Sequence, residues 1–324
     1  MTDGSTIATP VLAPGNPVAV VFPGQGSQRP GMGRDFFEQF SVARDVFLEA
    51  SEALGLDLAA ICFDDDSRLD RTELTQPAIL VTEIAMTRAL SVEVGLTPAW
   101  FGGHSLGEYT ALCAAGVIPL DVAVRVVRRR GALMQAAVAE GEGAMIAVLA
   151  ADIAGSDLVG EVARAGVDLA NRNSPDQIVL SGPKHAIVRA ESLIRERLDG
   201  TDHDVVWLKV SAPFHSRAMR VIEDDLRAML VEALPRMAPE RATVVTSNLT
   251  GTFHEGRGGP LVDALVGQAS GPVDWIANMR ALASVASTIY EVGPNRPLRG
   301  FFRAVGRDVV SITSARGIVR ERSA

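Results

Sequence analysis

Ser105 lies in a stretch whose residue types and spacing could support nucleophilic catalysis. It is the middle residue of Gly103-His104-Ser105-Leu106-Gly107, where an apolar run ends and a helix-like segment begins. A nucleophile elbow needs this strand-turn-helix context, because a serine on so tight a turn requires neighbours without side chains. The same pattern can arise by chance in a chain with 30 glycines, and the alternative interpretation is an ordinary loop. Ser105 is therefore a candidate nucleophile.

A serine nucleophile needs a base, and the chain has five histidines. His104 adjoins Ser105 on the elbow, so its side chain should point away from the position of a base. His215 follows a predicted strand at 207–210, and the ends of strands in α/β sheets are where sites are built. It is either the base or a structural histidine with internal hydrogen bonds. Surface positions are expected for the remaining three, which are His185, His203 and His254.

Short apolar runs predict the sheet that would position these residues. Residues 17–22 form such a run, closed by a proline and a glycine, and runs of this kind are typical of parallel strands buried on both faces. Similar signals recur at 243–246, 289–292 and 309–312. A helix is expected to start at Thr75-Gln76-Pro77 and to end at Gly95.

A second helix, opened by Asp121, carries three consecutive arginines, 128–130, on mixed faces, as a solvated helix does. Between 138 and 211 the rhythm changes to four short strands and two helices in the order βαββαβ. They are expected at 144–149, 156–165, 167–170, 177–180, 185–198 and 205–210. This is the split-βαβ, ferredoxin-like pattern, compact enough for an insertion in a larger α/β domain. Residues 251–260 are expected to form an exposed glycine-rich loop.

The composition limits the classes of protein that fit. The 324 residues are 47% hydrophobic and 22% charged, as in globular proteins, and no apolar stretch is long enough to span a bilayer. Residues 1–16 lack the features of a secretion signal, which predicts a floppy tail and a cytoplasmic protein. Cys62 and Cys113 form no metal-ligand pattern and are expected to be buried thiols. A net charge of -8 argues against a general nucleic-acid binder.

Several motifs in order along the chain carry a family resemblance. They include Phe22-Pro23-Gly24-Gln25-Gly26, Thr75-Gln76-Pro77, Gly103-His104-Ser105-Leu106-Gly107-Glu108, Arg130-Gly131, Asn173-Ser174-Pro175, Phe214-His215-Ser216, Ser247-Asn248 and Gly293-Pro294. From residue 18 to residue 312 the chain resembles the malonyl-CoA:acyl-carrier-protein transacylases and the acyltransferases of polyketide synthases. The resemblance implies a hydrolase-like α/β core, residues 17–137 and 212–324, with a ferredoxin-like insertion, residues 138–211.

The resemblance also assigns catalytic roles. Ser105 would take the acyl group as an ester, and His215 would act as its base and later as the acid for the leaving thiol. A backbone carbonyl from Gln268 would orient the imidazole in place of the usual carboxylate. Backbone N–H groups of Gln25 and Leu106 would bind the oxyanion, although Gln25 has a second interpretation as a turn residue.

The substrate would be read by side chains around the dyad. The resemblance pairs Arg130 bidentately with the free carboxylate of malonyl, a geometry that lysine cannot reproduce. Phe214 would crowd an α-methyl group and so favour malonyl over methylmalonyl. Asn173 would lie near the CoA-binding part of the insertion, and His104 is placed with the substrate-binding residues. No metal or organic cofactor is called for.

The expected partners are malonyl-CoA and an acyl carrier protein, with no membrane and no nucleic acid, and a monomer is expected. Carrier proteins are acidic, so a local basic patch is needed for docking. The candidates are Arg217, Arg220, Arg296, Arg299 and Arg303, each of which could also be an ordinary solvated arginine. Alternative functions are a transferase for an unusual acyl group, an acyl-carrier hydrolase, and a catalytically idle docking protein. The retention of Ser105, His215 and Arg130 counts against the last.

Overall fold

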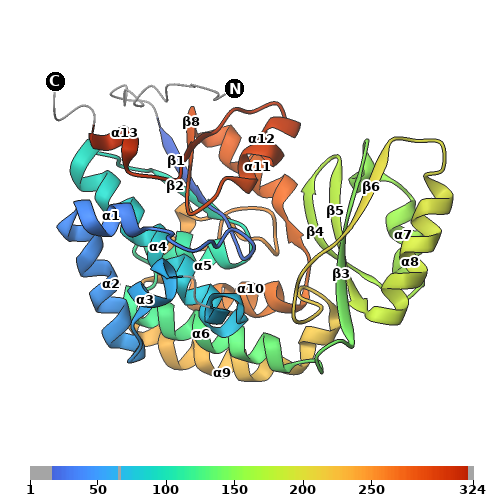
Figure 1. Ribbon diagram of the computed structural model, residues 1–324, viewed down its shortest axis with the longest axis horizontal. Helices are drawn as coiled ribbons and strands as arrows, with labels where there is room; N and C mark the ends of the chain where they lie inside the picture. The colour runs from blue at the N-terminus through green and yellow to red at the C-terminus, as the bar shows by residue number, and fades with distance from the viewer. Residues whose placement is uncertain (1–16, 65–66, 320–324) are drawn as a thin grey trace.

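The computed structural model describes residues 17–64 and 67–319 and has an α/β architecture with two sheets (Figure 1). The first sheet is parallel, with four strands in the order β2-β1-β8-β9. These strands are β1 (Val18–Phe22), β2 (Trp100–Gly103), β8 (Thr288–Val292) and β9 (Val310–Ile312). The predicted α/β class with a parallel sheet is confirmed. The predicted N-terminal tail lies outside the described residues.

Strand β1 is buried on both faces, and its alternating side chains enter two different apolar cores. Val18, Val20 and Phe22 belong to the larger core, whereas Ala19 and Val21 belong to a core with side chains of α11 and α12. The helices of this part of the molecule are α1 (Arg34–Gln39), α2 (Ser41–Leu54), α3 (Leu58–Phe63), α4 (Thr72–Val94), α5 (Leu106–Ala114), α6 (Leu120–Ala136), α9 (Glu223–Ala233), α10 (Gly258–Ser270), α11 (Trp275–Val285), α12 (Pro297–Ala304) and α13 (Arg316–Val319).

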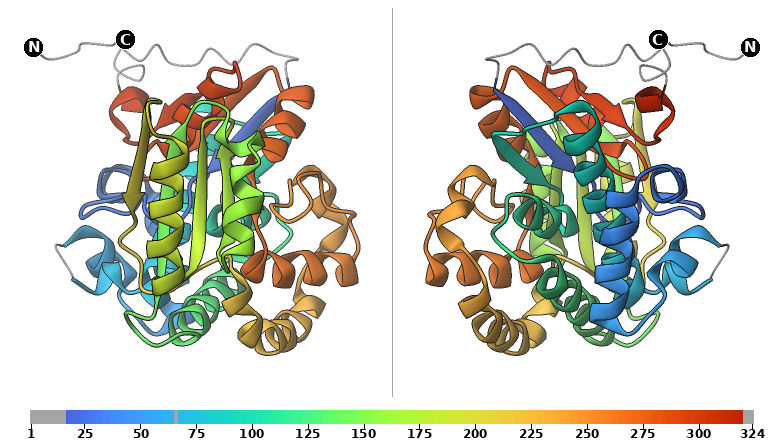
Figure 2. Two further views of the ribbon diagram at one scale, coloured as in Figure 1. Left: turned by 90° about the vertical axis from the view of Figure 1, so that its right-hand side faces the viewer. Right: turned by 90° about the vertical axis from the view of Figure 1, so that its left-hand side faces the viewer.

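The second sheet has the strand order β6-β3-β5-β4-β7 and is antiparallel except for β7, which runs parallel to β4. Helices α7 (Leu158–Arg164) and α8 (Lys184–Arg197) cover one face, as Figure 2 shows. The strands are β3 (Gly143–Ala150), β4 (Asp168–Ser174), β5 (Gln177–Pro183), β6 (His203–Trp207) and β7 (Val273–Asp274). Four strands and two helices follow the predicted βαββαβ order. The fifth strand, β7, comes from outside residues 138–211, so this sheet is not made by the predicted insertion alone.

Two predicted strands are wrong in whole or in part. Residues 243–246 do not form a strand: η5 (Pro239–Val244) is a 3₁₀ helix, and Val245 and Thr246 make isolated bridges, to Phe101 of β2 and to Phe253. The proline at the start of η5 has the fixed φ of a helical turn. The strand predicted to extend to residue 210 ends at Trp207. The other 3₁₀ helices are η1 (Ser67–Asp70), η2 (Ile153–Gly155), η3 (Arg217–Ile222) and η4 (Leu234–Arg236).

Helix α4 begins three residues earlier than the capping threonine predicted. Thr75 is inside the helix, where its hydroxyl donates to the carbonyls of Leu69 and Arg71 instead of capping the end. The predicted C-terminal boundary is confirmed, because Gly95 caps α4 in a left-handed conformation. Within the described residues, no helix has both the length and the apolar character needed to cross a bilayer.

The segment 251–260 is only in part the exposed loop that its glycines predicted, since Thr252, Glu255, Arg257 and Gly259 are exposed. Gly251 and His254 are buried, and α10 begins at Gly258. Gly251 has a positive φ of 71°, and a Cβ there would lie 2.5 Å from the Cβ of Ala277, so glycine permits both the turn and the close packing on α11. Gly251 therefore serves packing, whereas Gly259 has open space around it.

Candidate active site

Ser105 lies between β2 and α5 with a strained backbone, at φ 52° and ψ -103°. His215 also has a positive φ, of 55°, and Asp152 is the third non-glycine residue with this property in the described part of the chain. Such conformations cost about 1–3 kcal/mol each and cluster at functional sites. Two of these three residues with a strained backbone are therefore the predicted nucleophile and base.

The glycines around Ser105 are required by close backbone approach. A Cβ on Gly103 would lie 1.9 Å from the carbonyl oxygen of Gly107, and a Cβ on Gly107 would lie 2.2 Å from the carbonyl oxygen of Phe22. A Cβ on Gly24 would lie 2.4 Å from the carbonyl oxygen of His104. Glycine at these positions lets the loop after β1 lie directly against the elbow.

The side chains of Ser105 and His215 form a hydrogen-bonded pair. The Oγ of Ser105 lies 2.7 Å from Nε2 of His215, and Nδ1 of His215 lies 2.8 Å from the backbone carbonyl oxygen of Gln268. Because a carbonyl only accepts, Nδ1 carries the proton and Nε2 is left free to accept from the serine. Burial, followed by the charge of Arg130, lowers the pKa of His215 to about 3. The imidazole is therefore held neutral.

Arg130 is fully buried on α6, so the solvated interpretation of the three arginines is wrong for this residue. Its Nη1 donates to Oε1 of Gln76 at 2.9 Å, and its Nη2 donates to Oε1 of Gln268 at 2.9 Å and lies 3.4 Å from Oγ of Ser105. Its guanidinium carbon lies 5.2 Å from the ring centroid of Tyr109. Among the described residues, no carboxylate forms an ion pair with Arg130. This buried cation next to a nucleophile thus has no directly paired anion, and the carboxylate of Glu108 acts on it from a longer distance.

The remaining residues predicted to bind substrate surround this pair. His104 points toward the second sheet, with Nε2 2.8 Å from Oδ1 of Asn173, and burial lowers the pKa of His104. Phe214 is buried next to His215. Leu106 is the first residue of helix α5. The side chain of Gln25 donates from Nε2 to Oγ1 of Thr72 at 3.3 Å. The oxyanion-binding role of the last two residues stays a prediction.

The five arginines predicted for docking differ in their surroundings. Arg217 is held by the carboxylate of Asp168 on β4, with Nη2–Oδ1 and Nε–Oδ1 distances of 2.7 and 2.9 Å. It ties the segment after His215 to the second sheet and is not a free cation. Arg299 is half-buried, and the other four, Arg217 included, are exposed. Helix α12 lies beside the elbow, because the ring centroids of Phe301 and His104 are 6.4 Å apart.

Other polar residues of the site were assigned no role from the sequence. Oδ1 of Asn248 accepts from the backbone N–H of Ser105 at 2.6 Å, and the carboxylate of Glu108 contacts Gln268 and His254. The prediction of a surface His254 is therefore wrong. Glu108 could have been noticed from its place one helical turn after Ser105. Nothing near His254 in the sequence indicates its partner.

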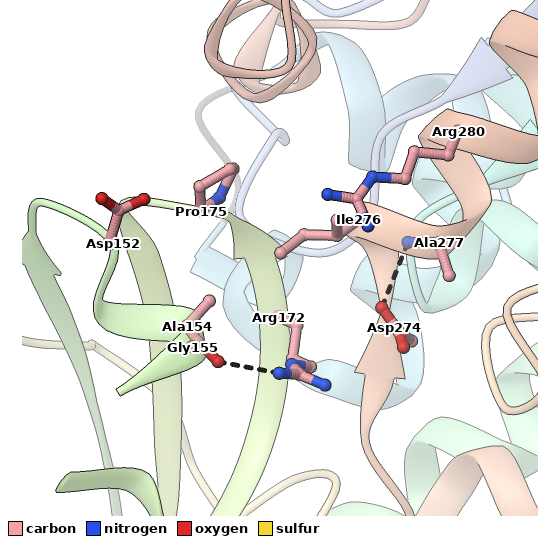
Figure 3. A pocket seen from close by; sticks show the side chains of 9 residues that line it. All are labelled: Asp152, Ala154, Gly155, Arg172, Pro175, Asp274, Ile276, Ala277 and Arg280. Carbon is pink, nitrogen blue, oxygen red and sulfur yellow. Dashed lines mark hydrogen bonds between the residues drawn. The ribbon is translucent and has the colours of Figure 1, made fainter. Parts of the chain in front are cut away.

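A separate pocket of about 300 Å³ lies between the second sheet and α11 (Figure 3). It is lined by side chains from the turn regions of that sheet and from the start of α11, and it contains none of the predicted site residues. Arg172 donates from Nη2 to the carbonyl of Ala154 at 2.7 Å within it. The candidate active site is therefore defined by the Ser105 geometry and not by this cavity.

An α/β fold with a serine on an elbow, a neutral imidazole hydrogen-bonded to it and a carbonyl orienting the ring defines a serine-dependent acyl-transfer protein. The Acyl transferase domain family matches residues 19–257. The malonyl CoA-acyl carrier protein transacylase of Escherichia coli K12 is 39% identical over 89% of this chain and 92% of its own length. The chain belongs to this family of acyltransferases, the malonyl-CoA:acyl-carrier-protein transacylases.

Solved structures agree with this assignment. The malonyl CoA-acyl carrier protein transacylase of Clostridium perfringens is 33% identical with a TM-score of 0.84, covering 95% of this chain and 96% of that one. A malonyl-transacylase in complex with a type II polyketide synthase acyl-carrier protein is also 33% identical, with a TM-score of 0.84 and coverages of 94% and 98%. The predicted family is therefore confirmed.

Proposed function

We propose that this protein transfers the malonyl group of malonyl-CoA to the phosphopantetheine thiol of an acyl carrier protein. The observation that carries the proposal is the buried guanidinium of Arg130, 3.4 Å from Oγ of Ser105 and without a carboxylate partner among the described residues. A buried cation is costly unless an anion pairs with it, and the free carboxylate of malonyl supplies that anion. The names of the relatives and the carrier complex of one structural neighbour support the same substrates.

In the first half-reaction, Oγ of Ser105 attacks the thioester carbonyl of malonyl-CoA while Nε2 of His215 takes the hydroxyl proton. The tetrahedral intermediate then expels the CoA sulfur, which receives that proton from the imidazolium, and malonyl remains as an ester on Ser105. The carbonyl of Gln268, 2.8 Å from Nδ1, stabilises the imidazolium that forms during the step.

In the second half-reaction, the carrier thiol gives its proton to Nε2 of His215 and attacks the ester carbonyl. Collapse returns the proton to Oγ of Ser105 and releases malonyl as a thioester of the carrier. The N–H groups of Gln25 and Leu106 would bind the oxyanion in both steps, and loss of one such donor costs about a hundredfold in rate. No redox step or cofactor is needed, because only an acyl group and protons move.

The setting of this activity follows from its substrates. Carrier-bound malonyl is the extender unit of fatty acid and of polyketide assembly, and the proposed activity serves either. The reaction needs malonyl-CoA and the carrier in one compartment, and we propose that this compartment is the cytoplasm. A monomer suffices, because both members of the dyad and Arg130 come from one chain.

Intact-protein mass spectrometry tests the proposal. Malonyl-CoA alone should add one malonyl group to the wild-type protein, and holo carrier protein should then remove it. Ser105→Ala should form no adduct, whereas Ser192→Ala, which changes an exposed serine on α8, should be acylated normally. An adduct on Ser105→Ala would refute the assignment. Loss of the adduct at one rate with and without carrier would instead favour an acyl hydrolase.

A further inference from the structure

A buried polar cluster lies beneath the dyad and consists of Glu108, Asn248, His254 and Gln268. The exposed fractions of Glu108, Asn248 and Gln268 are 0%, and that of His254 is 6%. Buried polar atoms are costly unless each has a partner, so a connected cluster of this kind holds its members in one arrangement. His254 is the member farthest from the reacting atoms, three contacts away from Arg130, which is assigned to the substrate carboxylate.

The side-chain amide of Gln268 has one favourable orientation in this cluster. Its Oε1 accepts from Nη2 of Arg130 at 2.9 Å, and its Nε2 donates to the carbonyl of Ser105 at 3.0 Å and to Oε2 of Glu108 at 2.7 Å. Rotation by 180° would point the amide N–H groups at a guanidinium and the amide oxygen at a carboxylate. The carboxylate of Glu108 thus keeps the oxygen of Gln268 directed at Arg130.

Glu108 is in turn held by donors at both of its oxygens. Oε2 accepts from Nε2 of Gln268 and from the backbone N–H of Asn248, the latter at 3.0 Å, and Oε1 accepts from Nε2 of His254 at 2.9 Å. Within the described residues, His254 is the side chain that hydrogen-bonds to Oε1 of Glu108. Without it, Oε1 loses this donor in a buried site, and the carboxylate is free to rotate away from Gln268.

We propose that His254 is a positioning residue of the acyl-transfer site. By holding Glu108, it fixes the amide of Gln268 and thereby aims the guanidinium of Arg130 at the carboxylate of the acyl group. This inference rests on the proposed function, since it assigns His254 to the selection of a carboxylated acyl group. It makes selectivity for malonyl over acetyl depend on a residue that touches neither Ser105 nor the substrate.

The substitutions His254→Gln and His254→Asn both introduce a side-chain amide, and together they distinguish a positioning role of His254 from a packing role. The amide nitrogen in His254→Gln can reach the place of Nε2 and still donate to Glu108, whereas the shorter side chain in His254→Asn cannot. The control is His185→Asn, at an exposed histidine on α8. For each variant, rates of self-acylation by malonyl-CoA and by acetyl-CoA are measured by mass spectrometry, with thermal unfolding as a check of the fold.

The malonyl-to-acetyl rate ratio should fall about tenfold in His254→Asn and stay within about threefold of wild type in His254→Gln and His185→Asn. Glu108→Gln is an independent variant that keeps the size but offers one acceptor oxygen where two are needed, and it should lower the ratio as well. Equal losses of both rates in these variants, or an unchanged ratio in His254→Asn, would overturn the inference. A wild-type protein that accepts no malonyl would refute the proposed function instead.

Discussion

The imidazole of His215 is set for its task by neighbours of three kinds. Apolar burial and the nearby guanidinium of Arg130 disfavour its charged form, and the carbonyl of Gln268 fixes the tautomer. A catalytic base must be unprotonated to accept the proton of Ser105, so a lowered pKa keeps it active under acidic conditions. The carboxylate of a bound substrate would offset the charge of Arg130 and raise the pKa again as the imidazole becomes an acid.

The first prediction concerns the pH dependence of this base. Because the pKa of His215 is lowered to about 3, kcat/KM for self-acylation should be level from about pH 5 to about pH 8, without the inflection near 6.5 of an ordinary histidine. Rapid-quench measurements with malonyl-CoA across this range provide the test. In Arg130→Met, one cause of the lowering is gone and any inflection should move upward. A wild-type profile that falls below pH 7 would contradict the assigned environment.

The second prediction concerns the recognition of the acyl carboxylate. Arg130→Ala should raise the activation free energy of malonyl transfer by about 3 kcal/mol, because the substrate carboxylate would be buried without a partner. The rate should fall by about two orders of magnitude. Acetyl transfer should fall much less. Arg130→Lys should give an intermediate loss, since an ammonium keeps the charge but not the bidentate fork. Equal losses for both acyl groups would mean that Arg130 acts only through its contacts with Gln76 and Gln268.

At the scale of elements, local sequence patterns predicted individual strands, turns and helices. They failed where the structure depends on contacts between segments distant in the sequence. The apolar run before Pro23 became β1, and the glycine pattern around Ser105 became a strand, a turn and a helix. The run at 243–246 resembles a strand, but it pairs with β2 only through the isolated bridge of Val245 to Phe101. His254 was misplaced because its polar neighbours resemble a loop, and its partner Glu108 is brought to it by tertiary packing.

The third prediction concerns the contact between β1 and the elbow. Gly107→Ala would place a Cβ 2.2 Å from the carbonyl oxygen of Phe22, so the two segments must separate. It should lower the free energy of unfolding by about 1–3 kcal/mol and reduce self-acylation, because it moves the oxyanion-binding N–H groups assigned to Gln25 and Leu106. Chemical denaturation and mass spectrometry measure both effects. Gly259→Ala, in the first turn of α10 with open space around it, is the matched control and should leave self-acylation unchanged and the free energy of unfolding unchanged or slightly raised.

At the scale of the whole molecule, the site is assembled from segments that adjoin both sheets. Ser105 follows β2 of the parallel sheet, His215 follows the segment that leaves β6, and Gln268 comes from α10. The bond between His104 and Asn173 and the ion pair of Arg217 with Asp168 each join the large part to β4. Strand β7 adds a third connection by pairing with β4. These three connections hold the second sheet against the segments that carry the dyad, an arrangement that no single motif could predict.

The last prediction concerns the approach of the acidic carrier to a protein of net charge -8. Docking needs a local basic patch, and the exposed Arg296 and Arg303 lie at the N-cap and in the last turn of α12, which lies beside the elbow. Arg296→Glu together with Arg303→Glu should slow malonyl transfer to the carrier about tenfold and flatten its dependence on salt. Self-acylation by malonyl-CoA should stay nearly unchanged.

The control for this pair carries the same total charge. Arg164→Glu together with Arg189→Glu reverses two exposed arginines on α7 and α8, far along the chain from α12. If repulsion depends only on net charge, the rate of malonyl transfer to the carrier will fall equally in both double variants. That result would exclude a local patch on α12. A larger loss in the α7 and α8 variant would place the carrier on the helices of the second sheet. A loss confined to the α12 variant is the expected result, because within a Debye length of about 8–10 Å only nearby charges guide the thiol to Ser105.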